Sequence, residues 1–554
     1  MTDTLRIASI QANPTLGAID ANAAKAAARI AEAKVLGAHL AVFPELFLIG
    51  YPPEDLALKP AAVAACQKAL EKLALETADG PAVLIGTLWP GAEGLPRNAV
   101  ALLQSGKIED VTFKVDLPNY GVFDERRVFE PGAAPKVWEV SGVKIGVPVC
   151  EDIWHGGVCG ALKAMGAEIL VVPNGSPFRY TADFERMDAA MARVFETGLP
   201  MVYVNQVGGQ DELGFDGGSF SLSAASQVVQ RMPLFTEAID CAEWTREEDG
   251  WACHGAMNSR WCEGPEEAYR AMVLGVGDYI RKSGFPGVII GMSGGIDSAL
   301  TAVIAADALG AANVRCVMMP SPYTSVESFE DAEACANNIK CSYEIISIAP
   351  AITAFSEMLT TAFAGRGPDT TEENIQSRAR GVTLMALSNK TGAMVLTTGN
   401  KSEMAVGYAT LYGDMCGGYN PLKDLYKTSV YEVARWRNTH DPFGGGSAPI
   451  PDRILTKAPS AELKPNQTDQ DSLPPYDVLD GILKGLVEEE ATLGEIVARG
   501  YPPAQVEQVQ RLLYGSEYKR RQAPPGVKLG PKAFGRDRRY PIVNGFRDCI
   551  TSKD

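Results

Sequence analysis

The chain has 554 residues, of which 46% are hydrophobic and 21% charged, so it is an ordinary folded protein of roughly two to four domains. Its net charge of −17 argues against binding to nucleic acid or to an anionic membrane, because both require a broad basic surface. The eleven cysteines form no CxxC pair and the first residues lack a secretion leader, so we expect a cytoplasmic protein. No apolar run approaches the roughly 20 residues of a membrane span.

Short apolar runs alternate with helix-length stretches in the first half, which is the pattern of a layered α/β domain. After Leu234 the alternation fades, and we expect the acidic segment 241–254 to connect two halves. We place a first domain at 1–245, a connecting segment at 246–264 and a second domain at 265–554. In the first domain we expect strands at 5–11, 39–43, 82–88, 144–149, 169–172 and 201–205, and helices at 21–36 and 61–76.

The second half begins with an amphipathic stretch, 265–282, whose apolar residues recur at helical spacing. Helix-length intervals then separate the expected strands. This alternation is typical of a doubly wound parallel sheet, which binds its ligand at the carboxyl ends of its strands. We expect strands at 288–290, 314–318, 343–348 and 393–397.

A glycine-rich turn, Ser293-Gly294-Gly295-Ile296-Asp297-Ser298, joins the strand at 288–290 to a helix-forming stretch. Small residues let backbone N–H groups approach an anion at the positive end of the helix. The turn lacks the GxxxxGK[ST] spacing of P-loop kinases. It resembles the SGGxDS loop of ATP pyrophosphatases, which transfer AMP to an acceptor; a plain glycine turn is the alternative. The ATP contacts expected here are Gly291, Met292, Ser293, Gly294, Gly295, Ile296, Asp297 and Ser298.

Three reactive residues follow apolar segments of the first half: Glu45, Lys114 and Cys150. Burying an unpaired charge is costly, so charges at strand ends are candidates for a shared site. A cysteine after an apolar strand is by itself most often a small buried hydrophobe. Together, the three resemble the Glu–Lys–Cys set of the nitrilase/amidase superfamily, which has an αββα sandwich fold. The resemblance covers about residues 5–234.

The superfamily resemblance implies attack of a thiolate on an amide. A free thiol has a pKa of about 8.5 and is mostly protonated at neutral pH, so a base is needed. Glu45 would take the thiol proton and return it to departing ammonia, while Lys114 would stabilise the oxyanion. Cys150 would form a thioester that water hydrolyses.

The stretch 117–125 is more specific, because it resembles the glutaminase domain of glutamine-dependent NAD synthetases. This resemblance implies that Tyr120, Phe123, Glu151 and Ser176 hold glutamine. For the two aromatic residues, core packing is the alternative.

One position departs from the family pattern. The basic residue usually found six places after Ser176 is Ala182 here. Arg179 and Arg186 remain the alternatives for binding the carboxylate of glutamine.

Segments beyond the glycine-rich turn resemble the synthetase domain of the same family. Asp297 and Glu403 would carry Mg²⁺, because this ion prefers one or two carboxylates plus phosphate oxygens and water. A solvated face is the alternative for the polar helix at 373–378 and for the basic run after 517. By resemblance, ATP would also contact Thr398, Lys427 and Ser460, and deamido-NAD would contact Asn374, Gln376, Arg378, Glu403, Asp414 and Lys519.

The resemblance to glutamine-dependent NAD synthetases covers nearly the whole chain. It implies that ATP adenylates the nicotinate carboxylate of deamido-NAD, and that ammonia from glutamine displaces AMP to give NAD. Free ammonia becomes ammonium at neutral pH, so we expect an enclosed route between the sites, and by resemblance a homo-oligomer. The alternatives are a nucleotide amidotransferase such as GMP synthetase, and a regulatory protein with an inert amidase half.

Overall fold

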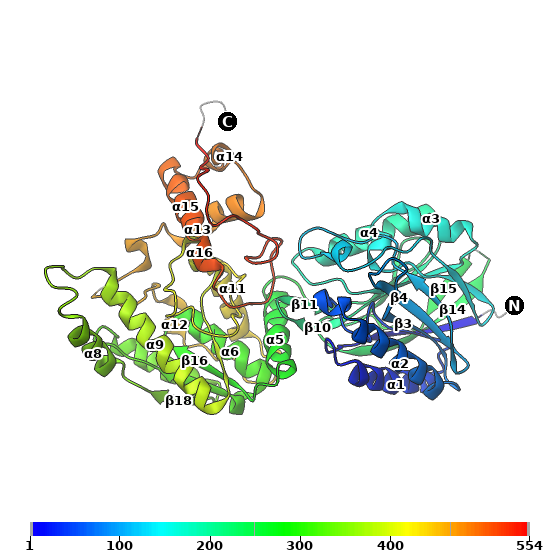
Figure 1. Cartoon of the computed structure of the whole chain (residues 1–554), viewed down its shortest axis with the longest axis horizontal. Coiled ribbons are helices and arrows are strands. Elements are labelled where there is room, and N and C mark those ends of the chain that lie inside the picture. The colour runs from blue at the N-terminus through cyan, green and yellow to red at the C-terminus, as the bar shows by residue number, and fades with distance from the viewer. Residues whose placement is uncertain (1–3, 249, 466, 551–554) are drawn as a thin grey trace. The chain divides into compact units, whose positions relative to one another are not determined.

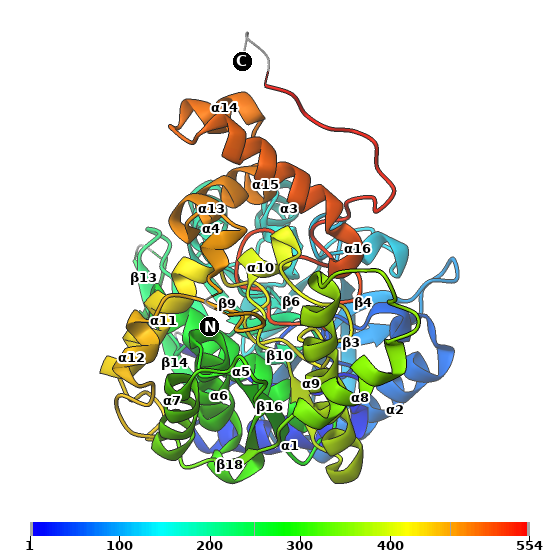
Figure 2. The same cartoon turned by 90° about the vertical axis from the view of Figure 1, so that its left-hand side faces the viewer.

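The computed structural model describes residues 4–248, 250–465 and 467–550. The chain divides into two compact units, Met1–Cys262 and Glu263–Asp554, which are shown in Figures 1 and 2. Within the described residues, no helix is both long and apolar enough to cross a membrane.

The first unit is a sandwich of two β-sheets between two layers of helices (Figure 1). Its strands are β1 Thr4–Gln11, β2 Leu40–Val42, β3 Ala82–Trp89, β4 Arg97–Gln104, β5 Lys107–Phe113, β6 Val137–Val140, β7 Val143–Gly146, β8 Ile169–Asn174, β9 Met201–Asn205, β10 Val207–Gln210, β11 Leu213–Asp216, β12 Phe220–Leu222, β13 Val228–Arg231, β14 Ala238–Glu247 and β15 Gly250–His254. Its α-helices are α1 Ile19–Val35, α2 Pro60–Glu76, α3 Gly156–Ala164 and α4 Ala182–Thr197.

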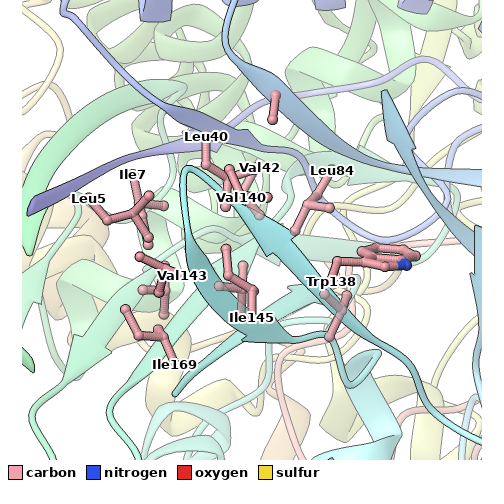
Figure 3. Close-up of a cluster of buried hydrophobic side chains, with 14 of the residues drawn as sticks. Leu5, Ile7, Leu40, Val42, Leu84, Trp138, Val140, Val143, Ile145 and Ile169 are labelled. Atoms are coloured by element: carbon pink, nitrogen blue, oxygen red, sulfur yellow. The ribbon is translucent and has the colours of Figure 1, made fainter. Parts of the chain in front are cut away.

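The sheet order explains the layers. One sheet has the order β15-β14-β1-β2-β3-β4-β5, and the other has the order β13-β12-β9-β8-β7-β6. Apolar side chains from the facing sides of both sheets fill the space between them, and Figure 3 shows Leu40 and Val42 opposite Val140 and Ile145. Helices α1 and α2 cover the first sheet, and α3 and α4 cover the second. The predicted αββα sandwich is therefore confirmed.

The segment 241–254, which we expected to be a connection, instead lies in strands β14 and β15 of the first sheet. Residues 238–245 of β14 pair antiparallel with β1, and Trp244 is completely buried. Trp244 lies in the core between the sheets, and the half-buried Ile239 and Cys241 pack against the core on the helix side. The acidic composition therefore concealed a strand with alternating burial.

The second unit contains a four-stranded parallel sheet in the order β18-β17-β16-β19. Helices cover both faces: Figure 2 shows α6 and α7 on one side, and α8 and α9 on the other. The predicted doubly wound parallel sheet is confirmed. The strands are β16 Val288–Met292, β17 Val314–Met318, β18 Ser342–Ile345 and β19 Met394–Leu396, and the first helices are α5 Pro265–Lys282, α6 Ile296–Leu309, α7 Val326–Asn338, α8 Ala349–Leu359 and α9 Thr370–Thr391.

Helices α10, α13, α14 and α15 form a cluster around a separate apolar core, whereas α11 packs against α5 and α6. Strand β16 is central in the sheet. The chain adds β17 and β18 on one side of β16 and then returns to add β19 on the other side, so the strand order reverses between β16 and β19. Such a point opens a crevice at the carboxyl ends of the strands. The later helices are α10 Lys401–Val406, α11 Lys427–Thr439, α12 Asp452–Thr456, α13 Tyr476–Leu483, α14 Leu493–Ala498, α15 Pro503–Gly515 and α16 Glu517–Arg520.

Candidate active sites

The structure brings Glu45 and Lys114 into direct contact in the interior of the first unit. Lys114 follows β5 and lies with its Nζ 2.8 Å from Glu45 Oε1, and both side chains are completely buried. Asn98 Nδ2 donates to the same oxygen over 2.7 Å, and the backbone N–H of Gly175 donates to Glu45 Oε2 over 2.9 Å. These contacts fix the orientation of the carboxylate.

Cys150 begins a short 3₁₀ helix, Cys150–Ile153, just beyond β7. Its φ of +45° is in the left-handed region, which a non-glycine residue rarely adopts and which often marks a functional position. Burial and the Glu45 carboxylate raise the pKa of the Cys150 thiol, whereas Lys114 and the Gly175 N–H lower it, with a net rise. The resting thiol is therefore protonated, and the Glu45 carboxylate is close enough to affect its pKa.

Glu125 also lies in this cluster, and the sequence interpretation did not assign it a role. Its Oε1 accepts from Lys114 Nζ over 2.9 Å and from the Tyr51 hydroxyl over 2.7 Å. Burial raises the pKa of Glu125 to about 7, with Lys114 opposing the rise and Glu45 adding to it. Glu125 is the last residue of the 117–125 stretch that resembles the glutaminase domain. That position could have indicated a role, but we assigned roles only to Tyr120 and Phe123 from this stretch.

The four residues expected to hold glutamine lie in two groups. The Tyr120 hydroxyl is 3.0 Å from each carboxylate oxygen of Glu151, and its ring packs edge-on against Phe123 at 5.5 Å. Tyr120 is 53% exposed, so it is not a core residue. Ser176 follows β8, and its backbone N–H donates to Asn205.

The two arginines considered for the carboxylate of glutamine differ in their surroundings. Arg186 is buried: its Nε donates to Ser176 Oγ over 2.9 Å, and its Nη1 pairs with both oxygens of Asp216. Arg179 is partly exposed and pairs with Glu185 at the start of α4. Arg186 therefore orients the Ser176 hydroxyl, and Arg179 is the more accessible cation.

In the second unit, the glycine-rich turn closes on itself between β16 and α6. Ser298 Oγ accepts from the Ser293 N–H over 3.2 Å and lies 3.0 Å from Ser293 Oγ. Gly294 has a φ of +77°, and a Cβ there would lie 2.4 Å from the carbonyl oxygen of Ser328. A glycine is therefore required at this position.

Asp297 and Glu403 lie on either side of the Lys427 ammonium. Lys427 Nζ contacts Asp297 and is 3.2 Å from Glu403 Oε1. Asn400 joins the two acids, because its Nδ2 donates to Asp297 Oδ1 and its Oδ1 caps the N–H of Glu403. Burial raises the pKa of Glu403 to about 7, with Lys427 opposing this rise.

A cavity of about 280 Å³ adjoins this cluster at the carboxyl ends of β16, β17 and β19. Every residue that we expected to contact ATP lines it. The cavity is also lined by Glu403 and Asp414 of the deamido-NAD set. The structure therefore gathers residues from distant segments in one pocket: Gly291, Met292, Ser293, Gly294, Gly295, Ile296, Asp297, Ser298, Thr398, Lys427 and Ser460.

The other expected deamido-NAD contacts lie outside the cavity wall. Asn374 accepts from the Thr410 hydroxyl, Gln376 is buried, and Arg378 is exposed and bonds to a backbone carbonyl. Lys519 Nζ donates to the carbonyls of residues 407 and 409, each over 2.8 Å. Their roles stay predictions.

Four charged residues of the wall were not singled out from the sequence: Arg380, Lys457, Glu462 and Asp469. Arg380 lies on α9 two residues after Arg378. Residues two apart lie on different faces of a helix, so the prediction for Arg378 did not extend to Arg380. Lys457 and Glu462 flank Ser460, and Lys457 Nζ is 3.2 Å from Glu462 Oε1.

Comparison with known proteins shows the same division of the chain. The sequence profile of the carbon-nitrogen hydrolase family matches residues 6–248, and that of the NAD synthase family matches residues 268–523. The chain is 51% identical over 551 residues to the glutamine-dependent NAD(+) synthetase of Rhodobacter capsulatus, covering 99% of this chain and 100% of that protein. The chain belongs to the glutamine-dependent NAD(+) synthetase family.

Solved structures agree with this family membership. The glutamine-dependent NAD+ synthetase of Acinetobacter baumannii, in complex with adenosine diphosphate, is 41% identical and has a TM-score of 0.78, covering 99% of this chain and 100% of that one. The enzyme of Cytophaga hutchinsonii, 21% identical with a TM-score of 0.82 over 98% of both chains, shares the fold. The chain is thus an enzyme that joins a carbon-nitrogen hydrolase half to an NAD synthase half.

Proposed function

We propose that this glutamine-dependent NAD(+) synthetase converts deamido-NAD to NAD, using ATP and the ammonia of L-glutamine and releasing AMP, pyrophosphate and glutamate. The observation that carries the proposal is the shared cavity of the second unit, where the glycine-rich turn, two carboxylates and Lys427 face one space. A turn of this kind suits a pyrophosphate, and the acids suit its cation.

In the first unit, Cys150 is the proposed nucleophile toward the glutamine amide. Glu45 takes the thiol proton and gives it to the leaving ammonia, and the thioester is then hydrolysed by water to glutamate. Lys114 supplies the positive charge that the oxyanion needs. Tyr120, Phe123, Glu151 and Ser176 are the proposed glutamine contacts, with Arg179 and Arg186 as alternatives for its carboxylate.

In the second unit, an oxygen of the nicotinate carboxylate attacks the α-phosphorus of ATP, and pyrophosphate leaves. The resulting mixed anhydride is electrophilic at its acyl carbon, where ammonia attacks and AMP departs. Thr398, Lys427 and Ser460 are the proposed ATP contacts outside the turn. Asn374, Gln376, Arg378, Asp414 and Lys519 are the proposed deamido-NAD contacts, together with Glu403.

Asp297 and Glu403 fit a magnesium ion that arrives with ATP. Their carboxylates already enclose one cation, the Lys427 ammonium. Among the residues that the structure describes, no cluster of three or more His, Cys, Asp or Glu side chains could hold a metal alone, and Mg²⁺ commonly completes its shell with phosphate oxygens and water. The ion would neutralise charge on the phosphates.

We also propose a cytoplasmic homo-oligomer. Helix α8 supports the assembly, because none of its residues is buried in the single chain although it carries the exposed apolar residues Phe355 and Met358. Apolar side chains gathered on one surface helix suit a contact between copies.

The test is exchange of labelled pyrophosphate into ATP, measured with deamido-NAD and with xanthylate as acceptor acids. We expect exchange with deamido-NAD alone, and AMP with pyrophosphate as products when ammonia is added. Exchange with xanthylate would favour a nucleotide amidotransferase. Formation of ADP and phosphate would refute the proposal.

A further inference from the structure

Three cationic side chains line the cavity of the second unit, and one of them lacks a partner acid. Lys427 is held between two carboxylates, and Lys457 is paired with Glu462. Within residues 4–248, 250–465 and 467–550, no carboxylate oxygen lies within 4.0 Å of the Arg380 guanidinium. Among the cationic side chains of the cavity wall, Arg380 thus differs in having no carboxylate at ion-pair distance among the described residues.

Helix α9 presents Arg380 to the cavity. The wall residues of α9 are Ser377, Arg380, Gly381 and Leu384, which share one helical face because their spacing is three or four. Arg380 Nε donates to the carbonyl oxygen of Met319 over 3.0 Å. In the described part of the chain, its two terminal nitrogens make no further hydrogen bond, so the outer edge of the guanidinium is available to a ligand.

Gly381 explains how α9 comes close to the segment that leads to Asp414, one of the predicted deamido-NAD contacts. A Cβ at this position would lie 2.8 Å from the carbonyl oxygen of Tyr412 and 3.0 Å from that of Gly413. A glycine therefore lets the helix pack against the backbone that leads to Asp414. Arg380, the preceding residue, donates a hydrogen bond to Met319, which directly follows β17.

The surroundings of Arg380 favour an anionic ligand. Burial lowers the pKa of Arg380 to about 10, and the more distant carboxylates of Glu462 and Asp414 only partly oppose this effect. The side chain is still charged at neutral pH. An anion that contacts its terminal nitrogens would replace the lost hydration, and a guanidinium binds carboxylate or phosphate oxygens in pairs.

We propose that Arg380 is a substrate-binding residue that contacts the anionic oxygens at the reacting centre of the synthetase half. This inference rests on the proposed function. Two groups there share the required chemistry, the α-phosphate of ATP and the carboxylate of the pyridine acid. The oxygens of the leaving pyrophosphate are instead assigned to the glycine-rich turn and Lys427 under the proposed function.

The test uses the full-length protein with Arg380→Gln and Arg380→Lys. Glutamine can still donate to the Met319 carbonyl, and lysine keeps the charge without the paired donors. Arg281→Met is the matched control, because Arg281 also donates to a backbone carbonyl but lies outside the cavity. Binding of α,β-methylene-ATP alone and of deamido-NAD alone is measured by calorimetry, followed by ATP–pyrophosphate exchange.

We expect Arg380→Gln to reduce exchange by about 10- to 100-fold, the effect of losing hydrogen bonds to a charged group, with a smaller loss in Arg380→Lys. Weaker binding of the nucleotide analogue identifies the α-phosphate as the partner, and weaker binding of deamido-NAD identifies the carboxylate. Unchanged exchange and unchanged binding of both ligands in folded Arg380→Gln would overturn the inference. If Arg380→Gln does not fold, Arg380→Lys decides by the same measurements.

The control reactions separate this inference from the proposed function. Wild-type protein without exchange in the presence of deamido-NAD refutes the function itself. If the wild type and Arg380→Gln show equal exchange, only the role of Arg380 is refuted. Glutamine hydrolysis in the first unit should be the same in all variants.

Discussion

Lys114 and Glu125 form an ion pair inside the first unit, with 2.9 Å between Nζ and Oε1 and at most 5% of either side chain exposed. Lys114 contacts Glu45 as well, so one ammonium holds two carboxylates. Burial by itself lowers the pKa of Lys114, but Glu125 and Glu45 outweigh burial and raise it well above its usual value. The lysine is therefore charged throughout the physiological range, as an oxyanion partner must be.

Glu125→Gln should lower glutamine hydrolysis by about 10²-fold, because Lys114 loses one of the two acids that fix its position near Cys150. NAD formation from ammonium salts should be unchanged. Both rates are measured on the same preparation. Glu139→Gln, at an exposed position on β6, is the control, and an equal loss in both variants would contradict a specific role for Glu125.

The same variant should change how stability depends on pH. The raised pKa of Glu125, about 7 against an ordinary 4.5, means that the folded state binds the proton more tightly than the unfolded chain. The resulting stabilisation is complete below about pH 4.5 and is lost as pH rises through about 7. Glutamine mimics the protonated acid and does not titrate.

We therefore expect the melting temperature of the wild type, relative to that of Glu125→Gln, to fall between about pH 5 and about pH 8. Differential scanning across this range checks the prediction. A constant difference would show that Glu125 has the same proton affinity in the folded and unfolded states.

Cys150→Ala should separate the two nitrogen sources. Glutamine-driven NAD formation should fall about 10³-fold or more, because no other group can form the thioester, whereas formation from ammonium salts continues. Cys159→Ala, which removes a buried cysteine of α3 outside the cluster, should keep both activities. Retained glutamine-driven activity in Cys150→Ala would mean that Cys150 is not the nucleophile.

The sequence predicted the elements that bear clear apolar periodicity, such as α5 and β17. Every predicted ATP contact lines the cavity of the second unit, whereas four of the six predicted deamido-NAD contacts do not. The sequence did not predict β14, because the acidic and polar residues of this strand interrupt its apolar pattern. Glu125 and Arg380 were missed for another reason: a charged residue shows its role only through the partners that folding brings to it. Pairing across 11 residues, as in Lys114 and Glu125, leaves no local signal.

The role of the glycine-rich turn can be tested at Gly294. Gly294→Ala places a methyl group 2.4 Å from the Ser328 carbonyl oxygen and forces a side chain into a φ of +77°, so the turn must move away from α7. We expect ATP–pyrophosphate exchange to fall by about 10²-fold or more, since small displacements of reacting groups are that costly. Glutamine hydrolysis, which depends on the first unit, should persist. Gly515→Ala is the control, because a Cβ there meets nothing within 4 Å. Full exchange activity in Gly294→Ala would show that the turn does not bind the phosphates.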